Sequence, residues 1–190
     1  MKTLIITAHP SSVGHTHRIA HNYKDAREEL GHKVEILDLY APENFLPYLS
    51  FENMRTDWPT SNLIDSMKEK ILRSDEIVFV HPIWWSFMPA IMKNFIDIVI
   101  HAGFAYNYSK DGKIIPHLTN KTAKIFATSG GPAWIYLTPI SPFKNLWSKF
   151  ILGFVGMKVK EIKICGNMAK PGAEERFMKF LEEIKKSAKK

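Results

Sequence analysis

The stretch IVFVHPIWWSFMPAIMKNFID, residues 77–97, joins an apolar run, an aromatic turn and the start of a helix. Its first residues are continuously apolar, which is typical of a parallel strand buried on both faces. Pro89 falls in the first turn of the following helix, where its missing N–H costs little. This unit indicates an α/β fold. Trp84 and Trp85, placed where the strand ends, suggest contact with a flat ligand or a partner surface.

The same alternation continues on both sides of this stretch. Apolar runs predict strands at 3–8, 33–40, 76–81, 123–129 and 159–166. Apolar residues spaced three or four apart predict helices at 16–30, 63–72, 91–102, 143–154 and after Pro171. Five strands alternating with helices predict one parallel sheet with right-handed crossovers and helices on both faces.

We expect residues 1–190 to form one domain, with a long aromatic excursion at 41–62. Connections longer than about 12–15 residues are usually functional or disordered. The aromatic residues of this segment favour packing over disorder. They are Phe45, Tyr48, Phe51 and Trp58.

Composition excludes several classes of protein. The chain has 190 residues, of which 45% are hydrophobic and 24% charged, as in ordinary globular domains. A single cysteine, Cys165, excludes an internal disulfide and fits a reducing cytosol. No apolar run approaches about 18 residues, so we expect no membrane span. The first residues resemble a strand more than a signal peptide, and we expect a cytoplasmic protein.

The formal net charge of +7 is concentrated near the C-terminus, where 158–190 holds ten Lys/Arg and five Asp/Glu. The segment EERFMKFLEEIKKSAKK places apolar residues at helical spacing with charges between them. A solvated lysine face on a terminal helix explains this charge. Because no recognised nucleic-acid motif accompanies it, we expect no nucleic-acid partner.

In open α/β sheets, ligands bind beyond the carboxyl ends of the strands, where the strand order reverses. The first segment at such a position is AHPSSVGHTHRIA (8–20), a strand–loop–helix junction. The N-terminus of a helix favours an anion, and hydroxyl and imidazole donors surround this one. They are Ser11, Ser12, His15, Thr16 and His17. The segment is neither G-x-x-x-x-G-K-[ST] nor G-x-G-x-x-G, so a phosphate monoester fits best, with simple helix capping as the alternative.

The histidines of this segment also raise the question of a metal. His17 and His21 are four residues apart on a predicted helix, and His9 and His15 are near them in sequence. No acidic or cysteine ligand nearby completes a recognised set, so we predict no metal site.

The segments HPIWWSFMP (81–89) and TSGGPAWIY (128–136) follow the third and fourth strands. Gly130 and Gly131 permit close approach of the backbone and leave N–H groups free, although a plain turn has the same composition. Together, the three segments offer a phosphate-binding site, an aromatic surface of two tryptophans and a glycine loop with free N–H donors. This combination predicts a bound flavin, with Pro82–Ser86 along its ring. A core or dimer cluster is the alternative for the two tryptophans.

On these residues the chain resembles the flavodoxin-like NAD(P)H:quinone oxidoreductases. These include the mammalian quinone reductases, the bacterial modulator of drug activity B and an ancillary oxidoreductase of potassium efflux. The most specific segment is HPIWWSFMPAIMKNFIDIVIHAGFAYNY (81–108), similar to the family's Pro-x-x-Trp…Pro-Ala-x-x-Lys-x-x-x-(Asp/Glu) run followed by Gly-Phe-Ala-Tyr. The resemblance implies a flavodoxin-like doubly wound sheet of five parallel strands in the order 2-1-3-4-5.

The resemblance also implies site residues. The expected flavin contacts are His9, Ser11, His15, Thr16, His17, Pro82, Ile83, Trp84, Trp85, Ser86, Thr128, Ser129, Gly130, Gly131 and Tyr136. The expected substrate pocket comprises Trp85, Tyr106, Tyr108, Gly130 and Gly131. Tyr136 would act catalytically beside the flavin carbonyl during hydride transfer. Mammalian members pair that tyrosine with a downstream histidine, whereas the last histidine here is His117.

The implied activity is ping-pong transfer of two electrons from NAD(P)H to a quinone or similar acceptor, with the slot closed by a second subunit of a homodimer. The chain lacks the C-terminal extension with which mammalian members bind the adenine half of FAD, so we expect FMN, with FAD as the alternative. Two other functions remain open. One is a flavodoxin-type electron carrier, and the other is a regulatory subunit of a potassium-efflux transporter.

Overall fold

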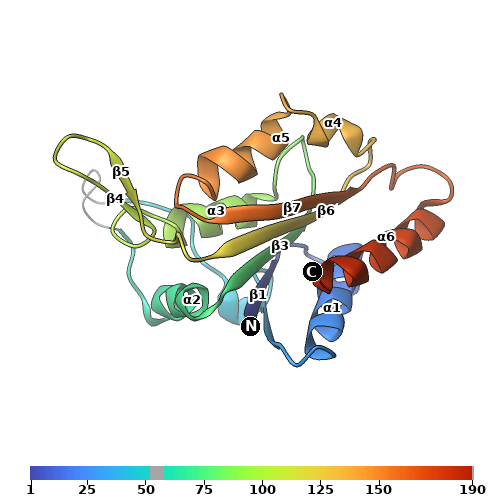
Figure 1. Cartoon of the computed structure of the whole chain (residues 1–190), viewed down its shortest axis with the longest axis horizontal. Coiled ribbons are helices and arrows are strands. Elements are labelled where there is room, and N and C mark those ends of the chain that lie inside the picture. Colours follow the sequence, from blue (N-terminus) through green and yellow to red (C-terminus); the bar gives the residue numbers. More distant parts are fainter. Residues whose placement is uncertain (52–57, 190) are drawn as a thin grey trace.

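The structure is a computed structural model that describes residues 1–51 and 58–189. Its centre is a parallel sheet in which five strands follow the order β2-β1-β3-β6-β7 (Figure 1). The strands are β1 (Lys2–Thr7), β2 (Lys33–Asp38), β3 (Glu76–Pro82), β6 (Thr122–Thr128) and β7 (Lys158–Cys165). In chain order of the sheet strands this is 2-1-3-4-5, which confirms the predicted flavodoxin-like topology.

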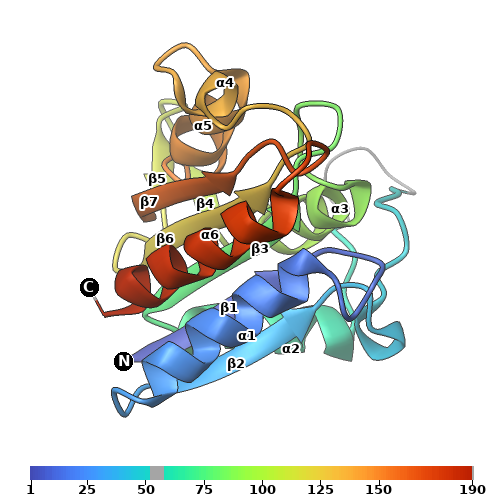
Figure 2. The same ribbon diagram turned by 90° about the vertical axis from the view of Figure 1, so that its right-hand side faces the viewer.

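Helices cover both faces of the sheet (Figures 1 and 2). One face carries α1 (His15–Glu28) and α6 (Ala173–Ala188), and the other carries α2 (Asn62–Arg73) and α3 (Ala90–Val99). Successive strand residues point to opposite faces, so each strand feeds both cores. Ile5, for example, packs with the helices α1 and α6, whereas Leu4 and Ile6 belong to the larger cluster on the other face.

The predicted helix at 143–154 is wrong in form. The chain makes one turn of α-helix, α5 (Pro142–Asn145), and continues as a π-helix, η2 (Leu146–Ile151). The hydroxyl of Ser148 donates to the carbonyl of Lys144 at 2.7 Å, the kind of side-chain bond that competes with the regular α-helical ladder. A further single turn, α4 (Trp134–Leu137), precedes α5.

A short hairpin was not predicted. It pairs β4 (Tyr106–Tyr108) with β5 (Ile114–Pro116), and its turn contains Gly112 at φ +78°. Asp-Gly between two β-prone runs is a recognised hairpin signal. The dipeptide 111–112 was therefore the sequence feature that could have revealed it.

The excursion begins with a 3₁₀ helix, η1 (Pro42–Asn44), and is then fixed to α3 by one buried side chain. The Asn94 amide donates to the carbonyls of Leu46 and Pro47 at 3.1 and 3.0 Å, and its oxygen accepts from the N–H of Leu49 at 3.2 Å. The start of the excursion thus packs on the helix, but through its backbone and Leu46, whereas the side chains of Phe45 and Tyr48 are exposed. Residues 52–57 lie outside the described residues.

A buried ionic network joins α1 to the sheet at the N-terminal edge of the strands. One carboxylate oxygen of Glu76 accepts from Thr3, Tyr23 and Arg27 at 3.3, 2.9 and 3.0 Å, and the ammonium of Lys124 lies 3.7 Å from the other oxygen. Burial raises the pKa of Tyr23 and lowers the pKa of Lys124. Tyr23 therefore stays a neutral donor. Within the described ranges, no helix is long and apolar enough to cross a membrane.

Candidate active site

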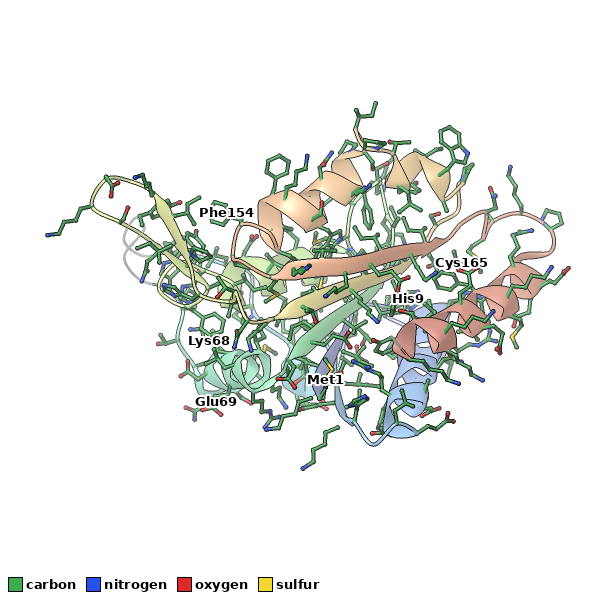
Figure 3. The ribbon with its side chains drawn as sticks, in the orientation of Figure 1. Met1, His9, Lys68, Glu69, Phe154 and Cys165 are labelled. Atoms are coloured by element: carbon green, nitrogen blue, oxygen red, sulfur yellow. The ribbon has the colours of Figure 1, made fainter. Side chains whose placement is uncertain are left out.

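The loops after β1, β3 and β6 meet at one edge of the sheet. β3 lies between β1 and β6, and the chain reverses its direction of winding between β1 and β3. The N–H of Ala8 donates to Val80 at 3.1 Å, and that of Ile83 donates to Thr128 at 2.7 Å. Figure 3 shows His9 and Cys165, both near the ends of strands, at this same edge. The three predicted segments are therefore brought together at the switch point of the sheet.

Helix α1 begins without a side-chain cap. Gly14 is the N-cap residue, and neither Ser11 nor Ser12 bonds to the first turn. The N–H groups of residues 15–17 have no acceptor in the described part of the chain, and neither does the buried hydroxyl of Thr16. Free N–H groups at a helix N-terminus bind anions well. The capping alternative thus has no contact to support it, and these donors remain available for a phosphate.

His9 is held across this loop by a close backbone approach. Nδ1 of His9 lies 3.0 Å from the N–H of Ser11, which can donate to it, and 3.2 Å from the carbonyl of Ser11, to which a protonated Nδ1 can donate. A Cβ added to Gly14 would lie only 3.1 Å from the imidazole, tighter than most packed contacts. Glycine at this position lets the imidazole fold over the start of α1. The His9 ring is therefore held beside the free amides through its Nδ1 contacts to Ser11.

The side chains of His15 and His17 are engaged elsewhere. The His17 Nε2 donates to the carboxylate of Asp38 at 3.0 Å, and the ring of His15 packs edge-on against Phe177 with centroids 4.3 Å apart. Both residues present free backbone N–H groups at the start of α1, and the buried Nδ1 of His17 has no partner among the described residues. No cluster of three metal-binding side chains occurs in the described ranges.

The two tryptophans lie in a tight turn at the end of β3. The N–H of Trp84 donates to Phe87 at 3.0 Å, and the N–H of Phe87 donates back at 2.8 Å. The two residues between them, Trp85 and Ser86, have φ values of 52° and 62°, a left-handed conformation that is costly for a side-chain-bearing residue. Trp85 is fully exposed, and the ring of Trp84 lies 6.1 Å from that of His9. A strained turn that presents an exposed indole at a switch point is typical of a binding site.

The glycine loop after β6 is fixed from behind by the connection between β7 and α6. The carbonyl of Ser129 accepts from Met168 at 2.9 Å, and the carbonyl of Gly131 accepts from Asn167 at 2.7 Å. A Cβ on Gly166 would lie 2.4 Å from the nitrogen of Ala133, so only glycine allows this approach. The N–H groups of residues 130 and 131 have no acceptor among the described residues. The loop therefore presents free donors at the edge of the site.

Tyr136 stands beside this loop. Its hydroxyl would be 4.0 Å from a Cβ built on Gly131, and its ring packs edge-on against Phe143 with centroids 5.9 Å apart. Tyr136 and the free N–H groups of the glycine loop thus lie on the same side of the site.

Tyr106 and Tyr108 lie at the other end of the molecule. They belong to β4, beyond the far end of α3, and the ring of Tyr106 packs against Phe154 with centroids 4.8 Å apart. Figure 3 shows Phe154 on the opposite side of the molecule from His9. One chain does not bring these tyrosines to the Trp84–Trp85 turn.

Sequence reasoning gave no role to His81, which lies buried in β3 just before the tryptophan turn. Its Nδ1 donates to the carbonyl of Pro82 at 2.9 Å, and its ring stacks on Trp147 with centroids 5.5 Å apart. Complete burial lowers its pKa to about 4. A histidine between a buried run and a proline could have been noticed, but its partners come from distant segments.

Comparison with known proteins agrees with this architecture. The model of a family described as having a flavodoxin-like fold matches residues 1–188. An uncharacterized NAD(P)H oxidoreductase of Haemophilus influenzae is 38% identical over 133 residues, which are 68% of this chain and 65% of that protein. An FMN-dependent NADH:quinone oxidoreductase of Macrococcus caseolyticus is 29% identical over 93% of this chain and 92% of its own.

The solved structures give the same result. The NAD(P)H:quinone oxidoreductase of Methanothermobacter marburgensis superposes with a TM-score of 0.84 at 26% identity, covering 99% of this chain and 97% of the other. The match of the family model spans nearly the whole chain. The chain belongs to the flavodoxin-like fold family, among relatives named as NAD(P)H and quinone oxidoreductases.

Proposed function

We propose that this protein is a flavin-dependent NAD(P)H oxidoreductase that passes two electrons to a quinone or a similar acceptor. The proposal rests on one observation. Two groups of free backbone N–H donors and one exposed aromatic turn meet at the switch point of the sheet. They are the free amides of α1, the exposed Trp84–Trp85 turn and the free amides of the glycine loop. The names of the family relatives support the same class of reaction.

The residues present fit a flavin mononucleotide. The phosphate would lie on the amides of residues 15–17, with the Thr16 hydroxyl and His9 as further donors. The ring would lie along Pro82–Ser86, and the amides of Gly130 and Gly131 would meet its polar edge. FMN needs only one phosphate position, and α1 offers one uncapped N-terminus. These contacts favour FMN, in agreement with the FMN-dependent relative from Macrococcus caseolyticus.

When bound, the flavin supplies the redox chemistry, accepting a hydride from the nicotinamide and giving two electrons to the acceptor in a ping-pong cycle. The protein's part is to orient and to stabilise charge. The Tyr136 hydroxyl and the Gly130 amide would face the carbonyl edge, where negative charge develops. Preorganised donors of this kind cost no reorganisation during the reaction.

We further propose a homodimer in which Tyr106 and Tyr108 line the acceptor slot of the partner subunit. The support is their separation from the tryptophan turn in one chain, together with large exposed apolar side chains around α4 and η2. The exposed side chains are Trp134, Ile135, Ile140 and Phe150. Sedimentation at assay concentrations should give a dimer, and an active monomer would contradict this assignment.

The phosphate site can be tested with a ligand pair that differs only in the phosphate. Thr16→Ala should weaken FMN binding about 10- to 100-fold, because a hydrogen bond to a charged group contributes about 1.5–3 kcal/mol. Riboflavin, which lacks the phosphate, should bind parent and variant equally. Ser12→Ala, in the same loop but with no assigned contact, is the matched control. Equal loss of FMN and riboflavin would show that the substitution disturbs the fold and not a phosphate contact.

A turnover assay with NAD(P)H distinguishes the proposed oxidoreductase from the two alternatives, an electron carrier and a subunit of a transporter. Steady NAD(P)H–quinone turnover by the purified protein would exclude a carrier that has no substrate of its own. The net charge of +7 also contrasts with the acidic surface expected of such carriers. Turnover at the same rate after removal of all membrane material would show that activity needs no transporter.

A further inference from the structure

A chain of hydrogen bonds leads from Arg176 on α6 to the glycine loop. The Nη2 of Arg176 donates to the carbonyl of Asn167 at 2.7 Å. The next N–H in the chain, that of Met168, donates to the carbonyl of Ser129 at 2.9 Å. The peptide unit of Ser129 continues into Gly130, whose N–H has no acceptor in the described ranges. Two peptide units thus connect a guanidinium to a free amide.

Peptide geometry fixes the direction of that free amide. In a planar trans peptide, the C=O and the N–H point to opposite sides. Because Met168 holds the Ser129 carbonyl on the side of the β7–α6 connection, the Gly130 N–H must point away from it. Gly130 is exposed, so this N–H faces outward at the edge of the site.

Arg176 fixes the whole connection and not just one carbonyl. Its guanidinium also donates to the carbonyls of Pro171 and Lys170, each at 2.8 Å. Asn167, at φ 57°, holds a left-handed conformation that asparagine tolerates better than most residues. The planar fork of arginine can hold several carbonyls at once, which a lysine ammonium on its flexible stem does less well. Arg176 therefore holds three carbonyls of the connection behind Gly130 with one side chain.

We propose that Arg176 is a positioning residue that orients and polarises the Gly130 N–H through these two peptide units. Hydrogen bonds in series strengthen one another, by about 10–30% per bond in condensed-phase estimates, and the first bond here is charge-assisted. The inference rests on the proposed function, in which the Gly130 N–H meets the edge of the flavin that becomes negative on reduction. The guanidinium then stabilises the reduced flavin without touching it.

The test compares Arg176→Gln, Arg176→Lys and Glu183→Gln. Glutamine removes the charge and the fork, whereas lysine keeps the charge but replaces the fork with a single point donor. Glu183 pairs with Lys163 at 3.2 Å and so also joins α6 to β7, but it makes no hydrogen bond to the relay carbonyls. Glu183→Gln removes a charge and an α6 contact at a more exposed position, which makes it the control for loss of a contact between α6 and β7.

The first readout needs no cofactor. In the flavin-free protein, hydrogen exchange of the Met168 amide should be at least about tenfold faster in Arg176→Gln, because the Asn167 carbonyl in its peptide unit loses its charged donor and keeps only the N–H of Lys170, at 3.1 Å. Glu183→Gln should exchange at the parental rate. Unchanged exchange at Met168 in Arg176→Gln would overturn the relay, whatever the protein binds.

The second readout is the two-electron potential of bound FMN. The reduced form should be stabilised about tenfold less in Arg176→Gln, a shift of about 30 mV to more negative values for a two-electron couple. Reduction at saturating NAD(P)H should slow about 10- to 100-fold with little change in KM, as for a displaced catalytic group. Arg176→Lys should fall between variant and parent, and it replaces Arg176→Gln if the latter fails to fold.

The outcomes distinguish a failure of the proposed flavin-dependent function from a failure of the Arg176 relay. A parent protein that binds no flavin refutes the proposed function, while the exchange measurement still decides the relay. A parent that is reduced normally, beside an Arg176→Gln variant with parental potential and faster Met168 exchange, refutes only the electrostatic role. A negative potential shift in Arg176→Gln, absent from Glu183→Gln, supports the proposal.

Discussion

Burial of the His81 imidazole makes the stability of the fold depend on pH. Burial lowers the pKa of His81 from its ordinary 6.5 to about 4, partly opposed by the bond to the Pro82 carbonyl. As the pH falls, His81 becomes protonated near pH 6.5 in the unfolded chain but only near pH 4 in the folded chain. The unfolded state binds more protons in this window, so the free energy of unfolding falls as the pH falls.

The size of the effect follows from the shift. Each pKa unit corresponds to about 1.36 kcal/mol, so a shift of this size gives about 3 kcal/mol. Most of that loss should occur between pH 6.5 and pH 4, and none of it above pH 7.5. For a domain with an unfolding free energy of about 5–15 kcal/mol, this is a large fraction of the total.

His81→Phe isolates the titration. Phenylalanine keeps a buried ring against Trp147 but cannot bind a proton, and its packing cost and the lost bond to Pro82 are constant offsets with pH. Urea unfolding of parent and variant at pH 7.5, 6.0, 5.0 and 4.5 gives the difference in unfolding free energy at each pH. That difference should change by about 2–3 kcal/mol across the series, in favour of the variant at low pH. Parallel curves would refute the buried neutral histidine.

Two further substitutions test the site and the core, and a third is the control for burial. Tyr136→Phe should slow flavin reduction by NAD(P)H about 10- to 1000-fold, because it removes one hydrogen-bond donor to the charge that develops on the flavin. FMN affinity should be nearly unchanged, since the aromatic ring remains. If stopped-flow bleaching of the flavin proceeds at the parental rate, Tyr136 is only a packing residue. Glu76→Gln should lower the unfolding free energy by about 3–5 kcal/mol, because it leaves buried Arg27 and Lys124 without their counter-charge. Glu35→Gln, which breaks a more exposed pair with Lys70, should cost less than about 1 kcal/mol, and equal losses would contradict the importance of burial.

Local sequence was enough to predict the sheet. Each strand is a short apolar run that must be buried on both faces, and each connection has the length and periodicity of a helix. The segments at the switch point followed from the same reasoning, because the carboxyl ends of parallel strands share one edge. The Trp84–Trp85 turn and the Gly130–Gly131 loop are therefore where the sequence placed them.

The hydrogen-bond partners of individual side chains could not be predicted from the local sequence in the same way. The imidazole of His17 was predicted as an anion donor, and its Nε2 in fact donates to Asp38 of β2, a contact that no local pattern indicates; its buried Nδ1 has no partner among the described residues. Arg176 serves the glycine loop from a segment 46 residues away in sequence, by bonds to backbone carbonyls that any residue offers. The predicted helix at 143–154 continues as a π-helix, in which the Ser148 hydroxyl donates to the Lys144 carbonyl, and apolar periodicity does not distinguish this form from an α-helix.

The separation of Tyr106 from the tryptophan turn was also invisible at the level of sequence. Motif order placed both in one substrate pocket, whereas α3 spans the distance between them within one chain. A helix of ten residues is about 15 Å long, so its two ends cannot line the same small pocket.

Flavin titration followed by anaerobic NAD(P)H tests the central claim most directly. The flavin-free protein is titrated with FMN while the visible spectrum and fluorescence are recorded, and NAD(P)H is then added before a quinone. The account predicts saturable binding of FMN, bleaching of its visible absorbance by NAD(P)H and recovery of that absorbance on addition of the quinone. A protein that takes up neither FMN nor FAD, or one whose bound flavin NAD(P)H does not bleach, would contradict it.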